Sequence, residues 1–153
     1  MLFVTISPKQ AAHYSYMCTR LSSVVHKMSA ARKNLENIAN KSFDKSFAKC
    51  VYLLASESLQ CENEMRSHID SLNCSSYQEE ALSEKNSIPE TSANNIEALC
   101  KYFEEIYLAS YKKLLGDKKF GSSIKSLIQN HLQLFMSSLT QMRLFDDVKN
   151  AVN

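Results

Sequence analysis

Glycine and proline are scarce in this chain, and their scarcity restricts the folds that it can adopt. The 153 residues include only two glycines and two prolines, whereas the two residues together make up about 12% of an average protein. β-Sandwiches, barrels and doubly wound α/β domains need these residues at their many turns. The composition therefore favours an all-α fold in which a few long helices are joined by few turns.

The spacing of the apolar residues predicts four amphipathic helices. In the first two, apolar residues recur alternately three and four residues apart, which is the heptad pattern of packed helices. Residues 7–10, Ser-Pro-Lys-Gln, offer an N-cap, a proline in the first turn and a capping-box glutamine. Gly116 follows the last turn of the third helix, where a terminating glycine is common. The predicted helices cover about 8–41, 44–72, 93–115 and 121–150.

The connections between these helices alternate short, long and short, which predicts a single-domain four-helix bundle over 1–153. The acidic connection 73–92 is long enough to cross the whole bundle, so the third helix can run parallel or antiparallel to the second. Lysines gather at the first joint and again between the last two helices. A crossover places these two groups at opposite ends and avoids their repulsion. We therefore expect a ferritin-like bundle with a long crossover between the second and third helices.

The charge balance and hydropathy argue against several kinds of partner. The chain carries 18 basic and 16 acidic residues, a balance that does not favour nucleic acid or an anionic membrane. No apolar run approaches the length of about 18 residues that spans a bilayer, and residues 1–6 lack the features of a signal peptide. We expect a cytoplasmic protein whose partner is another protein or a second copy of the chain.

The cysteines show no pattern of a disulfide framework or a metal cluster. Their number is odd and no Cys-x-x-Cys pair occurs. We expect them to be reduced and mostly buried as small apolar residues, which agrees with a cytoplasmic location. The cysteines are Cys18, Cys50, Cys61, Cys74 and Cys100.

A ferritin-like bundle prompts a search for a di-metal site. Such sites need a Glu-x-x-His sequence on each of two helices, and none occurs here. The weak metal candidates are Glu64, His68 and His131; of these, Glu64 and His68 are four residues apart and can share a helix face. His68 and His131 are expected to miss each other by about 10 Å along the bundle. The sequence predicts no metal site, no bound cofactor and no catalytic residue.

Other catalytic arrangements also lack support. His26 is followed by Lys-Met-Ser, which differs from the Leu-Lys-Gly that follows the histidine of phosphotransfer bundles. With Gly116 and Gly121 as the only glycines, no phosphate-binding loop or nucleophile elbow can form. We therefore predict that the chain is not an enzyme.

The third predicted helix carries three tyrosines that point to an interaction surface. Tyr102, Tyr107 and Tyr111 are spread around an ideal α-helix, so they cannot all face one core. Tyrosine is enriched at protein–protein interfaces. These residues are the candidates for an interface, including a homodimer interface.

The chain resembles a group of bacterial ferritin-like four-helix-bundle domains of unknown function over about residues 20–147. The residues that carry the resemblance lie in 54–57, 96–100, 109–115, 124–128 and 142–144. Ser58 stands where that family commonly has an arginine, and a tryptophan-containing stretch is absent. The resemblance implies a ferritin-like bundle and no activity, since the family has none assigned.

Together these observations predict a non-catalytic bundle that acts as an interaction or oligomerisation module. The alternative is a bundle that binds a metal or a small ligand through Glu64 and His68.

Overall fold

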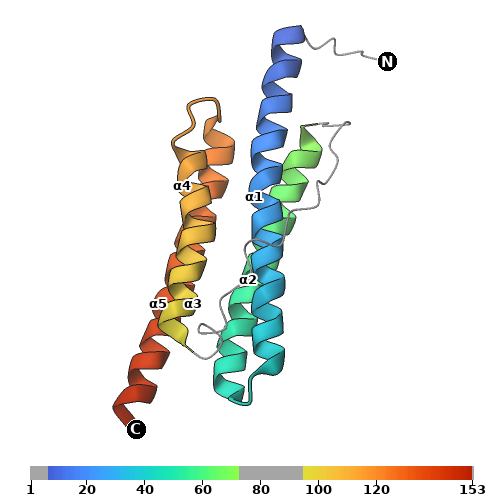
Figure 1. The fold of residues 1–153 in the computed structure, drawn as a ribbon. Coiled ribbons are helices and arrows are strands. Elements are labelled where there is room, and N and C mark those ends of the chain that lie inside the picture. Colours follow the sequence, from blue (N-terminus) through green and yellow to red (C-terminus); the bar gives the residue numbers. More distant parts are fainter. Residues whose placement is uncertain (1–6, 73–94, 153) are drawn as a thin grey trace.

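The computed structural model describes residues 7–72 and 95–152 and shows an all-α, four-helix bundle (Figure 1). Its third helix is continuous but is divided into two α-helical parts around a central π-helical segment, η2. The elements are α1 (Pro8–Lys41), α2 (Lys45–Ser71), α3 (Ile96–Phe103), η2 (Glu104–Leu108), α4 (Ala109–Leu115) and α5 (Ser122–Val152). The predicted helix positions are confirmed within a few residues at each described end, and residues 73–94 lie outside the description.

Side-chain caps explain where three of the helices begin. At the start of α1, Ser7 and Gln10 form the predicted capping box. The Asp44 carboxylate accepts hydrogen bonds from the backbone N–H groups of Ser46 and Phe47 and so caps α2. At the start of α3, Asn95 accepts from the Ala98 N–H. Each cap satisfies N–H groups that the first helical turn leaves without an internal partner.

The helix directions confirm the predicted crossover. The chain runs down α1, up α2, up again through α3 and α4, and down α5 (Figure 1). Contacts agree with this picture, because Ser58 of α2 meets Tyr107 and Glu64 of α2 meets His131 of α5. The end of α2 and the start of α3 therefore lie at opposite ends of the bundle, as in ferritin-like connectivity. The two lysine groups are consequently separated.

One continuous core fills the space between the helices. The seams predicted for α1 and α2 are largely buried, and Leu21, Leu35 and Val51 are fully enclosed. The third helix contributes the bulkiest buried side chains, which include Phe103, Tyr107 and Tyr111. No helix among the described residues is both long and apolar enough to cross a membrane.

The cysteines correct one expectation. Cys50, Cys61 and Cys100 are free, and the last two are buried as predicted. Cys18 is disulfide-bonded, so the prediction that every cysteine is reduced is wrong. An odd number of cysteines excludes a complete set of pairs but leaves room for a single pair. Cys74 lies outside the described residues.

Two adjacent leucines on α2 provide a test of the core. Leu54 is 1% exposed and Leu53 is 57% exposed. Replacing Leu54 with alanine should lower the free energy of unfolding by about 2–5 kcal/mol, because it leaves a cavity. At a concentration at which the chain is monomeric, the Leu53→Ala variant should stay within about 0.5 kcal/mol of the parent. Urea unfolding of both variants measures the difference, and similar losses at the two positions would contradict this orientation of α2.

Candidate functional site

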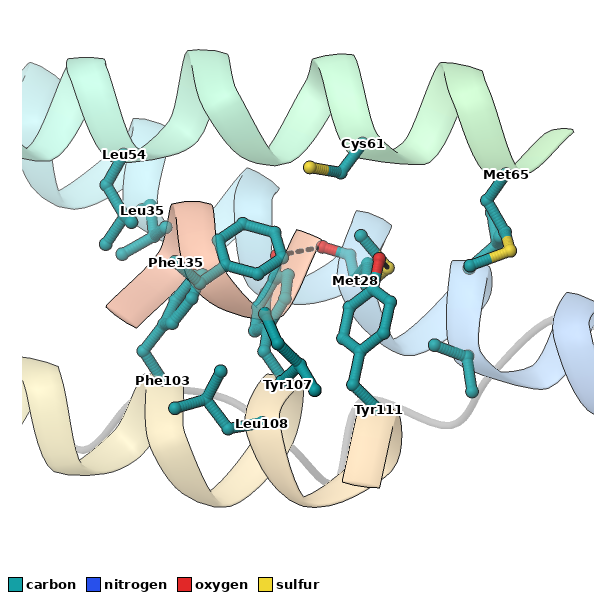
Figure 2. Close-up of a cluster of buried hydrophobic side chains, with 14 of the residues drawn as sticks. Met28, Leu35, Leu54, Cys61, Met65, Phe103, Tyr107, Leu108, Tyr111 and Phe135 are labelled. Atoms are coloured by element: carbon teal, nitrogen blue, oxygen red, sulfur yellow. Dashed lines mark hydrogen bonds between the residues drawn. The ribbon is translucent and has the colours of Figure 1, made fainter. Parts of the chain in front are cut away.

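The third helix places a row of aromatic side chains in the core. Phe103, Tyr107 and Tyr111 extend from it toward the other helices (Figure 2). The rings of Phe103 and Tyr107 are stacked with their centroids 3.8 Å apart. Phe135 of α5 packs its ring against the edges of both, at centroid distances of 5.2 and 5.5 Å. These are favourable arrangements for aromatic pairs.

The π-helical segment explains how these rings come to lie in one row. In an ideal α-helix, residues 103, 107 and 111 would rotate by about 80° over eight positions. In η2 the Ala109 N–H donates to the Glu104 carbonyl, five residues earlier. This wider turn needs more residues per revolution, so residues four apart stay closer to a single line. Short π-helical segments often occur at functional sites.

The Tyr107 hydroxyl links three helices inside the core. It donates to the backbone carbonyl of Met28 on α1 and accepts from the Ser58 hydroxyl on α2, at 2.9 Å. Both Tyr107 and Ser58 are completely buried. Since each group has its partner, the cost of removing the polar atoms from water is offset.

A charged pair lies beside this hydroxyl group. Glu62 of α2 is 1% exposed, and its Oε2 accepts from Arg32 Nε of α1 at 2.6 Å. The same guanidinium donates to Glu36 at 2.8 Å, so Arg32 holds one buried and one partly exposed carboxylate. The Oε1 atom of Glu62 has no hydrogen-bond partner among the described residues.

A second polar chain runs from the core to the surface. His131 of α5 is 3% exposed; its Nδ1 lies 2.9 Å from the Tyr111 hydroxyl and its Nε2 lies 2.6 Å from Glu64 Oε2. The tautomer with hydrogen on Nε2 satisfies this chain, because Tyr111 then donates to His131 and His131 donates to Glu64. The Glu64 side chain is 45% exposed. The histidine therefore joins a buried hydroxyl to a carboxylate that meets solvent.

Burial controls the protonation of the neutral groups around these chains. Burial raises the pKa of the Tyr107 and Tyr111 hydroxyls well above their usual range. Burial, reinforced by the negative charges of Glu64 and Glu57, raises the pKa of the Cys61 thiol to about 12. At neutral pH these groups are uncharged, and a protonated thiol is a poor nucleophile. The cluster is thus arranged for hydrogen bonding within the core.

The structure corrects the expected position of two tyrosines. Tyr107 and Tyr111 are both fully buried, so neither is available on the surface as the predicted interface requires. Residues four apart share a face of a helix, so Tyr107 and Tyr111 both follow Phe103 into the core, and only Tyr102 lies on another side. Tyr102 is half-buried and accepts a hydrogen bond from Asn34 of α1 at 3.5 Å.

The metal candidates are only partly brought together. Glu64 meets His131, whereas His68 lies one turn further along α2 and is not part of this pair. His68 is half-buried, and this burial lowers its pKa. No group of three or more His, Cys, Asp or Glu side chains is placed to hold a metal ion within 7–72 and 95–152.

Sequence reasoning missed Arg32, Glu62 and Ser58. The sequence did indicate that Glu62 and Ser58 are buried, because Ser58, Glu62 and Met65 follow one another at helical spacing on the apolar seam of α2. A glutamate at such a position needs a buried partner. The sequence did not show which helix supplies that partner, since this depends on how α1 and α2 are aligned.

The buried ion pair can be tested with a double variant. Arg32→Met leaves the Glu62 carboxylate buried without its cation, which should cost about 3 kcal/mol of the free energy of unfolding. Replacing both residues, as Arg32→Met with Glu62→Met, should recover most of this loss because no charge remains buried. Urea unfolding of the parent, both single variants and the double variant measures the coupling. A double variant no more stable than Arg32→Met alone would contradict the pairing.

The raised thiol pKa values predict a loss of stability at alkaline pH. Burial raises the pKa of Cys100 to about 11 and that of Cys61 to about 12, from 9.0 in the absence of the fold. Above about pH 9 the unfolded chain therefore loses protons that the folded chain keeps, and the free energy of unfolding falls as pH rises. Urea unfolding between pH 8 and pH 11 should show this slope. It should be shallower in Cys61→Ala; an unchanged slope would contradict the assignment to this thiol.

Comparisons with protein families, with curated proteins and with solved structures found no match for this chain. The described structure is that of an all-helical, four-helix protein.

Proposed function

We propose that this chain is a non-catalytic interaction module that forms a homodimer through an apolar surface on α2 and α5. Three large apolar side chains define this surface, which we call the α2–α5 patch: Leu53, Leu144 and Val148. They are 57%, 58% and 63% exposed, respectively. Their exposure is the observation that carries the proposal, because large exposed apolar side chains that gather in one region commonly mark interaction sites.

The alignment of α2 and α5 places these residues toward the same end of the bundle. Glu57 of α2 accepts a hydrogen bond from Ser138 of α5. Leu53 lies one turn from Glu57, and Leu144 lies between one and two turns from Ser138 toward the same end of the bundle. Val148 follows Leu144 by a further turn, close to the ion pair between Lys149 and Asp44.

The contacts inside the bundle also favour a function that is carried out by surface residues. The hydroxyl groups of Tyr107 and Tyr111 and the ring of His131 are used in contacts between helices. The resemblance to bacterial ferritin-like domains of unknown function fits this bundle and suggests no activity. The homodimer is proposed through Leu53 and Leu144 in place of the tyrosines, since two of the tyrosines are buried.

Light scattering coupled to size-exclusion chromatography tests the dimer. The parent chain should have the mass of a dimer at high micromolar concentration. The double variant Leu53→Glu, Leu144→Glu should be monomeric, because closing the interface would bury charges without partners. Both positions are exposed, so the variant should keep the helical circular dichroism spectrum of the parent.

Met136 provides the matched control for this experiment. It is 55% exposed and lies two turns before Arg143, whose guanidinium contacts Glu97 and Glu104 of the third helix. It therefore belongs to the opposite flank of α5, and Met136→Glu should remain dimeric. A monomeric parent chain, or equal disruption by Met136→Glu, would overturn the proposed surface.

A second candidate function is the binding of a divalent metal ion at Glu64 and His131. The short contact between Glu64 Oε2 and His131 Nε2 favours it, because a carboxylate and an imidazole are common ligands of zinc and iron. A metal at Nε2 requires the tautomer of His131 with hydrogen on Nδ1, which then donates to the Tyr111 hydroxyl, as metal-binding histidines donate to their outer partners. The Glu64 side chain is 45% exposed, so water can supply the remaining ligands of an ion. The pair replaces the predicted combination of Glu64 with His68.

Metal analysis of protein purified without chelator tests this second function. If it is correct, the parent chain and His68→Gln should contain stoichiometric zinc, iron or manganese, and Glu64→Gln should lose it. His68 is the control because it lies on the same helix outside the pair. A metal-free parent chain, or equal metal content in Glu64→Gln, would exclude the site.

A further inference from the structure

We draw no further inference here: the strongest candidate, the open surface hollow on α2 lined by Ser56, Leu59, Gln60, Asn63, Glu64 and Ser67, carries nothing because its one charged group belongs to the Glu64–His131 pair already described and nothing in the structure shows what covers it.

Discussion

The buried Tyr107 hydroxyl is the interaction on which the arrangement of the helices depends. It belongs to the third helix, accepts from Ser58 of α2 and donates to the Met28 carbonyl of α1. Phe135 of α5 packs against the same ring. All four helices of the bundle therefore meet at one side chain. A hydroxyl group that is enclosed in this way has no access to water, so another arrangement of the helices would leave it without a hydrogen bond unless that arrangement offered equivalent partners. The positions of its partners therefore restrict how far each helix can be shifted along its neighbours.

The π-helical segment makes this position available. Without the wider turn between Glu104 and Leu108, the directions of Phe103, Tyr107 and Tyr111 would spread over about 80° around the helix. With it, Tyr111 reaches Met28 and His131 while Tyr107 reaches Ser58. The wide turn thus keeps in one row the aromatic side chains that contact the other three helices.

Much of the fold could be predicted because it depends on patterns that repeat along the chain. Apolar periodicity locates the helices, and repulsion between two groups of lysines distinguishes the crossover from simple up-and-down connectivity. The aromatic and polar contacts within the core were harder to predict from the sequence. The alignment of Phe103, Tyr107 and Tyr111 in one row depends on a local departure from α-helical geometry, and the burial of Glu62 depends on Arg32 of another helix. The pairing of Glu64 with His131 depends in turn on the alignment of α2 with α5, which no single helix determines.

The buried polar contacts also select one alignment of α1 with α2, which the apolar seams alone leave undetermined. The heptad seams of α1 and α2 would pack almost equally well if one helix slipped by seven residues, because apolar contacts have little directional preference. Such a slip would separate Arg32 from Glu62 and leave a buried carboxylate without its cation. We infer that the pair selects one alignment at a cost in stability that an apolar pair would avoid. The charged groups of the interior then serve the fold itself, which leaves the exposed side chains of the surface for the partner that we propose.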